Sequence, residues 1–452
     1  MHLKGRGQMS TVKIITTNVA KNEFWKVSEI ESQKIEDAMH VINVYPQIKN
    51  QTVEGFGGAF TEASAHNYSR LSEAKQKEFM KAYYSEEGLA YNMARVAMHS
   101  CDFALGNYTY IEEGDAELKT FDIAHDYKQI IPMIKEAQKE APQEIKFMVS
   151  PWSPPAFMKT TNEMNNGGQL KKEYYTAWAN YFVKFIQAYQ EAGIPMTYVT
   201  VQNEPAAVQT WDSCVYTGEE EGTFAGSYLG PALEAAGLGD IKLFVWDHNK
   251  ENLLNRANEI MSQEGTDKYV NGFAIHWYTG DHFEAISHTK RLYPNQEIIF
   301  TEGCVEYSRF ADSGEIDKAE MYAHDMIGNL KAGISAFIDW NLLLDEKGGP
   351  NHVGNFCAAP IMCTGDANEI EKRLSYYYIG HLSKFVKRGA SVIGTTQYTD
   401  RLEVVGFVNE TGERVVVVMN KTEDTIEISM HENLDGIYYK LEGRTITTFV
   451  YK

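Results

Sequence analysis

The 452-residue sequence has no run of about 18 consecutive apolar residues, so it predicts no membrane-spanning helix. Cysteine is scarce, with five residues in the chain. These cysteines are scattered and show neither the spacing of a disulfide framework nor that of a zinc site. We therefore expect reduced thiols and no structural metal. Positive charge is also in deficit, with 42 Lys and Arg against 62 Asp and Glu and a formal net charge of -20. Such an acidic chain repels phosphate-rich polymers, which argues against nucleic acid or an anionic membrane surface as a partner.

The N-terminal decapeptide MHLKGRGQMS carries positive charge, but no apolar segment follows it. A secretory signal peptide needs an apolar segment at that point. The sequence therefore predicts a cytoplasmic protein, with secretion by another route and the oligomeric state left open.

Both ends of the chain have the pattern of a β-sandwich. Beyond about Ala390, short β-prone runs alternate with turn residues, and Val12–Thr17 and His40–Tyr45 resemble further strands. A single core usually stops growing near about 250–300 residues, which favours a second domain. We expect residues 1–50 and 385–452 to form one antiparallel β-sandwich side domain, next to a catalytic domain of residues 51–384. The C-terminal strand candidates are Leu402–Val408, Arg414–Met419, Thr425–Ser429, Ile437–Leu441 and Thr445–Tyr451.

The central part alternates short apolar runs with long helical stretches, which is typical of an α/β fold with a parallel sheet. One such stretch places large aromatic residues from Tyr175 to Tyr189 at helical spacing, as expected for a buried helix face. Eight βα units favour a (β/α)8 TIM barrel over a doubly wound sheet, because no Gly-rich phosphate loop follows any strand. The predicted strands are Gly55–Gly58, Tyr91–Met98, Ile145–Ser150, Tyr198–Gln202, Lys242–Trp246, Gly272–His276, Ile298–Thr301 and Ala336–Asp339.

Two glutamates stand where a TIM barrel places its chemistry, at the carboxyl ends of strands. Glu204 follows the fourth predicted strand, next to Asn203, and Glu302 follows the seventh. These strands lie on opposite sides of a barrel mouth. A retaining glycosidase needs two carboxyl groups about 5–5.5 Å apart, one as acid/base and one as nucleophile. The sequence therefore predicts Glu204 as general acid/base and Glu302 as nucleophile.

A metal site is the weaker interpretation of the same strand ends. Asp247 with His248, His276, and Asp281 with His282 offer possible ligands, but hydrogen-bonded structural or sugar-binding histidines fit their spacing better. We expect no metal. Asp102 and Asp339 are alternative acids, and Asp339 fits a buried structural role equally well.

Eight short segments stand out along the chain: Gly55–Glu62, Ala94–Val96, Ser100–Phe103, Ser150–Pro155, Val201–Pro205, His276–Tyr278, Glu302–Cys304 and Asp339–Leu342. In this order they resemble glycoside hydrolase family 30, most of all its glucosylceramidase (acid β-glucosidase) branch and the bacterial members of that branch. The similarity extends over about residues 50–385, and the flanking β segments fit the side sandwich of the family.

The resemblance implies a retaining double displacement without a cofactor, with Glu204 as acid/base and Glu302 as nucleophile. It also implies that Arg95 supports the nucleophile carboxylate. The substrate would be a β-linked glucoside, glucan or glycolipid. The residues that the resemblance places around the glucosyl unit are Asp102, Trp152, Asn203, His276, Tyr278, Trp340 and Asn355.

Other functions stay open at this point. An endo-β-1,6-glucanase or β-xylosidase would keep the same catalytic pair, whereas a non-catalytic carbohydrate-binding protein would keep only the fold. A metal-dependent barrel enzyme is a further alternative. The leaving-group site is also undecided, because four aromatic residues could either line it or anchor loops. These are Trp211, Tyr216, Phe283 and Phe356.

Overall fold

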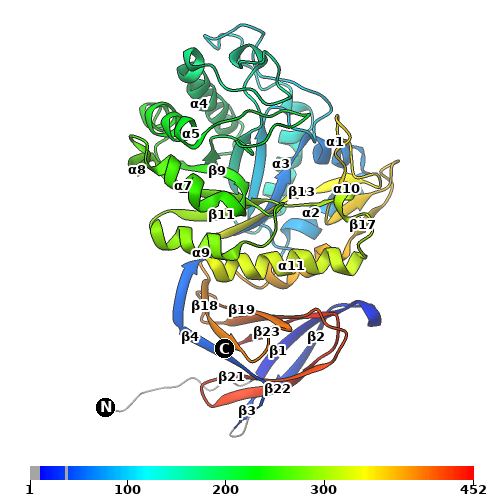
Figure 1. The fold of residues 1–452 in the computed structure, drawn as a ribbon. Coiled ribbons are helices and arrows are strands. Elements are labelled where there is room, and N and C mark those ends of the chain that lie inside the picture. The colour runs from blue at the N-terminus through cyan, green and yellow to red at the C-terminus, as the bar shows by residue number, and fades with distance from the viewer. Residues whose placement is uncertain (1–10, 36–38) are drawn as a thin grey trace.

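The computed structural model describes residues 11–35 and 39–452, so the basic N-terminal decapeptide lies outside the described residues. Eight parallel strands close into a barrel, in which each strand pairs with the next along the chain and the last returns to the first (Figure 1). All eight predicted strands are confirmed. They are β5 (Gly55–Phe60), β6 (Met93–Met98), β7 (Lys146–Pro151), β8 (Met196–Thr200), β9 (Lys242–Asn249), β10 (Val270–His276), β11 (Glu297–Glu302) and β13 (Ala336–Asn341).

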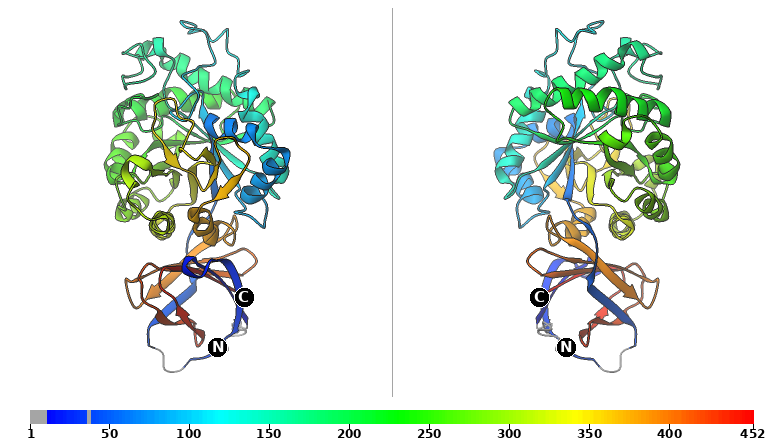
Figure 2. Two further views of the ribbon diagram at one scale, coloured as in Figure 1. Left: turned by 90° about the vertical axis from the view of Figure 1, so that its right-hand side faces the viewer. Right: turned by 90° about the vertical axis from the view of Figure 1, so that its left-hand side faces the viewer.

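Helices surround the barrel and bury their apolar faces against it (Figures 1 and 2). The predicted aromatic helix is α4 (Tyr175–Glu191), and its large aromatic side chains are buried as expected. The other helices are α1 (Glu62–Arg70), α2 (Glu73–Tyr84), α3 (Ile130–Glu140), α5 (Gly218–Phe224), α6 (Gly230–Ala235), α7 (Leu253–Met261), α8 (Thr266–Tyr269), α9 (Phe283–Leu292), α10 (Tyr307–Phe310), α11 (Glu315–Ala332) and α12 (Leu374–Ser383). Within residues 11–35 and 39–452, no helix is both long and apolar enough to cross a membrane.

The inside of the barrel is filled by side chains. A cluster of fully buried residues from different strands, including Met148, Phe244 and Ile299, packs in its interior. The barrel therefore has a packed core and is not a pore. The polar residues just beyond the strand ends therefore stand on a rigid apolar base.

The two chain ends form one ten-stranded sheet, which folds over its own apolar core beside the barrel (Figure 1). All its strand pairs are antiparallel except the pair of β4 and β21, which is parallel. The predicted strands are present, and β2, β3 and β18 are additional. The strands are β1 (Thr11–Asn18), β2 (Glu23–Glu31), β3 (Gln33–Lys34), β4 (Val41–Thr52), β18 (Ser391–Gln397), β19 (Leu402–Val408), β20 (Arg414–Asn420), β21 (Ile426–Glu432), β22 (Asp435–Leu441) and β23 (Thr445–Tyr451).

Short strands shape the loops that follow β11 and β13. β12 (Val305–Glu306) pairs antiparallel with β15 (Cys357–Ala358), which ties the β11 loop to the β13 loop. A small separate sheet continues the second loop, with β14 (Leu343–Asp345), β16 (Ile361–Cys363) and β17 (Ile370–Lys372). The two loops that flank the mouth of the barrel are therefore fixed to each other.

Candidate active site

Glu204 and Glu302 converge at the mouth of the barrel. Glu302 is the last residue of β11, and Glu204 lies just beyond the end of β8. One carboxylate oxygen of each residue and one ring nitrogen of His276 lie within 4.8 Å of one another. The separation between the two carboxyl groups is thus near the roughly 5–5.5 Å of a retaining glycosidase, and shorter than the roughly 6.5–9.5 Å that an inverting enzyme needs.

Arg95 on β6 fixes the nucleophile side of this pair. Its Nη1 donates to Oε2 of Glu302 at 2.7 Å, and its Nη2 donates to Oδ2 of Asp247 at 2.7 Å and to Oδ1 of Asn203 at 2.8 Å. The Nε atom donates to the Ser150 hydroxyl at 3.0 Å. The guanidinium is fully buried. Its planar fork therefore connects strands β6, β7, β9 and β11 at one point.

Asp247 on β9 is the acceptor at the centre of this network. Besides Arg95, it accepts hydrogen bonds from the hydroxyls of Thr200 at 2.7 Å and Thr301 at 2.6 Å. Its Oδ1 also lies 3.1 Å from Nε2 of His276. Burial opposes the charged form, but Arg95 and these donors hold the pKa of Asp247 well below its usual range. Asp247 is therefore a buried anion that orients Arg95 and His276.

His276 links Asp247 to Glu204. Its Nδ1 lies 3.5 Å from Oε1 of Glu204, on the other side of the ring from Asp247. Burial lowers the pKa of His276, but the negative charges of Glu302, Asp247 and Glu204 outweigh it and raise the pKa to about 9. The ring is consequently an imidazolium at neutral pH.

The two glutamates differ in their hydrogen-bond donors. Oε1 of Glu302 accepts from the Tyr278 hydroxyl at 2.8 Å and Oε2 accepts from Arg95, whereas Glu204 accepts from the Gln209 amide at 3.3 Å and faces Nδ1 of His276 at 3.5 Å. Burial and the charge of Glu204 raise the pKa of Glu302, against His276 and Arg95. Burial also raises the pKa of Glu204, but the imidazoles of His276 and His248 hold it below its ordinary value. The pKa shifts thus favour an ionised Glu204 in the free protein, whereas the fixed donors favour an ionised Glu302.

The backbone is strained where these side chains are presented. Glu204 has a φ of 48°, and the adjacent residues Trp246 and Asp247 have φ values of 75° and 41°. Non-glycine residues rarely adopt this left-handed region, which costs roughly 1–3 kcal/mol each. The amide of Glu204 donates to the carbonyl of Asp247 at 2.9 Å, so the two strained segments hold each other.

A second group of residues is packed beside the carboxylate pair, where the Arg95 guanidinium lies over the Trp152 ring. The rings of Trp152 and Trp340 stack with centroids 5.3 Å apart, and both rings are buried. Asp102 is buried with them and accepts from the amides of Asn351 and Asn355 at 3.3 and 3.2 Å. Burial, aided by the charge of Glu302, raises the pKa of Asp102 to about 8.

The structure brings all the predicted site residues to this mouth, but it gives several of them supporting positions. Asn355 donates to Asp102, and Asn203 accepts from Arg95. Asp339 is a buried structural residue, because its carboxyl accepts from the Tyr322 hydroxyl at 3.1 Å and burial raises its pKa to about 8. Sequence reasoning gave no role to Asn351 and considered Asp247 only as a metal ligand.

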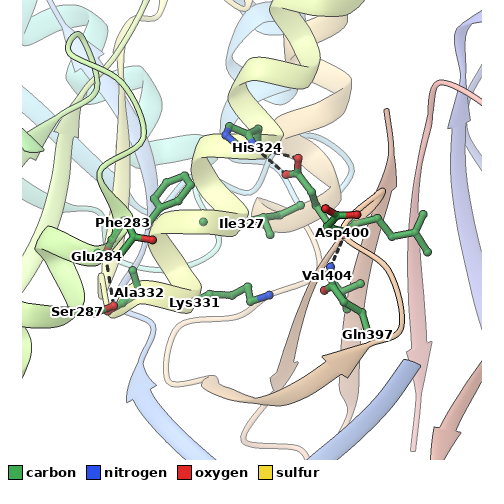
Figure 3. Close-up of a pocket in the computed structure, with 13 residues that line it drawn as sticks. Phe283, Glu284, Ser287, His324, Ile327, Lys331, Ala332, Gln397, Asp400 and Val404 are labelled. Atoms are coloured by element: carbon green, nitrogen blue, oxygen red, sulfur yellow. Dashed lines mark hydrogen bonds and ion pairs between the residues drawn. The ribbon is translucent and has the colours of Figure 1, made fainter. Parts of the chain in front are cut away.

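The four aromatic residues considered for the leaving-group site lie in different environments. Phe356 is exposed at the mouth, and Trp211 packs partly buried against the cluster around Trp152 and Trp340. Tyr216 is fully buried, so it anchors its loop. Phe283 lines a cavity of about 440 Å³ between the barrel and the β-domain (Figure 3). That cavity contains none of the predicted site residues.

One group in the described part of the chain offers the geometry of a metal site, and it is Glu204, His276 and Glu302. Its donors are already committed to other partners. Glu302 already accepts from Arg95 and Tyr278, and the other ring nitrogen of His276 faces Asp247. The arrangement therefore suits acid/base and nucleophilic chemistry between two carboxyl groups better than metal binding.

Comparisons with known proteins agree with this geometry. Residues 53–386 match the glycosyl hydrolase family 30 TIM-barrel domain, and residues 389–449 match the family's beta sandwich domain. Lysosomal acid glucosylceramidase of Mus musculus is 34% identical over 431 residues, which cover 91% of this chain and 83% of that protein.

Solved structures share the whole architecture. SrfJ from Salmonella typhimurium has a TM-score of 0.94 and 39% identity, covering 98% of this chain and 99% of that one. The endo-beta1,6-glucanase BT3312 has a TM-score of 0.88 and 29% identity, covering 98% and 99%. With both domain models matched in order and the carboxylate pair at the barrel mouth, the chain belongs to glycosyl hydrolase family 30.

Proposed function

We propose that this glycoside hydrolase is a retaining β-glucosidase of the glucosylceramidase type, with Glu302 as nucleophile and Glu204 as acid/base. The observation that carries the proposal is the pair itself, with oxygens within 4.8 Å of each other and two short donors, from Arg95 and Tyr278, on Glu302. The donors from Arg95 and Tyr278 belong to the protein and hold both oxygens of Glu302 as acceptors. We therefore assign the negative charge of the reacting pair to Glu302.

In the first displacement, a carboxylate oxygen of Glu302 attacks the anomeric carbon while protonated Glu204 gives its proton to the departing oxygen. In the second, ionised Glu204 takes a proton from water, which attacks the same carbon and releases Glu302. Neutralising Glu302 in the intermediate removes one charge beside Glu204 and eases its change of role.

We place the glucosyl unit beside the pair, at Asp102, Trp152 and Trp340. Asp102 would bind sugar hydroxyls, and the Trp152–Trp340 stack would support the apolar face of the ring. The side-chain oxygen of Asn203 accepts a hydrogen bond from Arg95, so the side-chain amide nitrogen of Asn203 is left to donate to a sugar hydroxyl. Lysosomal acid glucosylceramidase, similar over most of its length, supports glucosylceramide as a candidate substrate.

A β-1,6-glucan is the second candidate substrate. The similarity to the endo-beta1,6-glucanase BT3312 over nearly the whole chain favours it. The catalytic pair would be unchanged, because the two substrates differ only in what the glucosyl unit is attached to.

The test is hydrolysis of matched aryl β-glucoside, β-xyloside and β-galactoside, with Glu302→Gln and, as a control, Glu297→Gln. Glu297 lies at the opposite end of the same strand, where its partner is Lys242. We expect β-glucosidase activity that Glu302→Gln lowers by several orders of magnitude and that Glu297→Gln largely retains. Retention of the anomeric configuration is read from the first product by NMR. Inverted product, or a fully active Glu302→Gln variant, would refute the proposal.

A further inference from the structure

Strand β9 contains a bulge at the residues that deliver Asp247 to the active site. In its pairing with β10, the three-residue step from Val245 to His248 stands opposite a two-residue step on β10. Trp246 and Asp247 lie inside this step, with φ values of 75° and 41°. A bulge takes backbone groups out of the sheet ladder and re-aims a side chain, often next to an active site. The backbone amide of Trp246 therefore needs an acceptor from outside the sheet.

Glu221 on α5 supplies that acceptor. Its Oε1 accepts from the Trp246 amide at 2.7 Å, and the side chain of Glu221 is fully buried. Helix α5 packs on α7, and α7 packs on β9 (Figure 1). From α7, the Arg256 guanidinium lies over the Trp246 ring, 4.9 Å from its centroid. Trp246 is thus held at its backbone from α5 and at its ring from α7.

The environment of Glu221 indicates what its carboxyl group contributes. Burial raises the pKa of Glu221 to about 7, against Arg256 and the Trp246 amide, and the charge of Asp247 adds to the rise. The other oxygen, Oε2, is buried without a hydrogen bond among the described residues. A buried acceptor left unsatisfied costs about 1–3 kcal/mol, which an apolar side chain would avoid. Since the carboxyl group is partly neutral near pH 7, it offers Trp246 an acceptor oxygen more than a charge.

The catalytic network is attached to this bulge. Oδ2 of Asp247 accepts from Arg95 at 2.7 Å, and its Oδ1 lies 3.1 Å from Nε2 of His276. The backbone carbonyl of Asp247 accepts the amide of Glu204 at 2.9 Å. A left-handed conformation at a non-glycine residue costs roughly 1–3 kcal/mol and persists only where the surroundings enforce it. The hydrogen bond to Glu221 enforces it one residue before Asp247.

We propose that Glu221 is a positioning residue, which holds the bulge at Trp246 so that Asp247 is presented to the catalytic network. This rests on the proposed β-glucosidase function and adds to it a residue of α5, outside the strands of the barrel. Without the acceptor, the bulge can relax toward extended backbone. Asp247 then no longer meets Arg95 and His276 in the arrangement that fixes both catalytic glutamates.

The experiment compares three variants of Glu221 with the wild type on an aryl β-glucoside. Glu221→Gln keeps an acceptor oxygen at the same reach, Glu221→Asp keeps the acid but is one methylene shorter, and Glu221→Leu removes the acceptor. We expect kcat to stay within about threefold for Glu221→Gln and to fall about tenfold to 100-fold for the other two, because a small misplacement far from the chemistry can cost that much. Glu219→Leu, at an exposed glutamate of the same helix, is the control and should leave kcat unchanged.

A second comparison separates positioning from a general loss of structure. In an Asp247→Asn background the network that Glu221 serves is already broken, so adding Glu221→Leu should lower kcat by less than about threefold. A residue with a purely structural role would lower kcat by the same factor in both backgrounds. Circular dichroism establishes that each variant is folded before its kinetics are measured.

Hydrogen exchange of the Trp246 amide gives a readout that needs no substrate. The amide is buried and hydrogen-bonded in the wild type, so it should exchange slowly there and in Glu221→Gln, and faster in Glu221→Asp and Glu221→Leu. Unchanged exchange in Glu221→Leu, full activity of that variant, or equal factors in both backgrounds would overturn the proposal. A wild type inactive on aryl β-glucosides would refute the β-glucosidase function instead, and the exchange rates would still decide whether Glu221 holds the bulge.

Discussion

Arg95 donates to Glu302 over 2.7 Å from a guanidinium that has no exposed surface. The same group is bound to Asp247, which in turn orients His276 toward Glu204. The positions of both catalytic carboxyl groups therefore depend on one buried cation and one buried anion. Fixed donors around a reacting carboxylate are the kind of preorganisation that enzymes use to stabilise a transition state.

Replacing Arg95 with lysine should damage both catalysis and stability. A lysine carries the charge but cannot match the fork that serves Glu302, Asp247 and Asn203 together. We expect kcat on an aryl β-glucoside to fall about 100-fold or more, and the melting temperature to drop, because breaking buried ion pairs costs about 3–5 kcal/mol. Arg401→Lys, at an exposed ion pair of the β-domain, is the control. A fully active Arg95→Lys variant would show that the fork is dispensable.

Replacing Glu204 with alanine should separate substrates by their leaving groups. An activated aryl group departs without a proton, whereas an alkoxide needs one, and a general acid is worth about 10²–10⁴ in rate. We expect kcat/KM for an alkyl β-glucoside to fall by about that factor, and for a dinitrophenyl β-glucoside to fall far less. Steady-state kinetics on the two substrates is the measurement. Equal losses on both would contradict the role of Glu204 as acid.

Because the pKa of Asp102 is raised, the stability of the folded protein should depend on pH. Its pKa of about 8 in the folded protein exceeds the ordinary value of 3.8, so the folded state holds the proton more tightly. The stability that this proton provides is fully present below about 3.8 and is lost as the pH rises through about 8. The Asp102→Asn variant has no carboxyl group to ionise, so it does not lose this stability. The difference between its melting temperature and that of the wild type should therefore rise as the pH increases from about 3.8 to about 8, and then level off.

The control for this measurement is Asp312→Asn, which removes an exposed carboxyl group. Its melting temperature should follow that of the wild type at every pH. If Asp102→Asn also follows the wild type throughout, Asp102 is already ionised in the folded protein at neutral pH.

A buried ion pair behind the site gives a further test. Lys250, just after β9, donates to Asp325 on α11, and the side chains are 0% and 6% exposed. Lys250→Met should lower stability by about 3–5 kcal/mol, because it leaves the Asp325 carboxylate buried without its cation and with the Asn329 amide as donor. Lys250→Met combined with Asp325→Leu should recover much of the loss. Thermal melting of the three variants measures this, and additive losses in the double variant would contradict it.

The barrel could be predicted from sequence because its strands are short apolar runs. The helices between them could be predicted because their apolar residues recur at helical spacing, as in α4, and so lie on one buried face. Strand β2 was missed for the opposite reason. It forms an edge of the sheet and most of its residues are exposed, so its sequence alternates too weakly to mark a strand.

The two catalytic glutamates were predictable from their positions at strand ends, but their supporting network was not. The role of Asp247 depends on Arg95, Thr200 and Thr301, which come from three other strands or strand ends and meet only in the closed barrel. The conformation of Trp246 and Asp247, with positive φ at two bulky positions, also has no local sequence signal. The position of Phe283 could not be predicted from sequence either, because its ring lies against Gly328 of α11 and only the folded chain brings these residues together.

The first described strand, β1, pairs with the last, β23, so that Lys13 lies opposite Val450. On a ribosome, which releases the chain from its N-terminus, β1 and its first partner β2 emerge long before its second partner β23 exists. The barrel can assemble in the meantime, while the early strands wait with unpaired edges that a chaperone or a neighbouring chain could cover. Without β23, that edge of β1 would stay unpaired. The pairing of β1 with β23 is therefore a late event in the synthesis of this sheet.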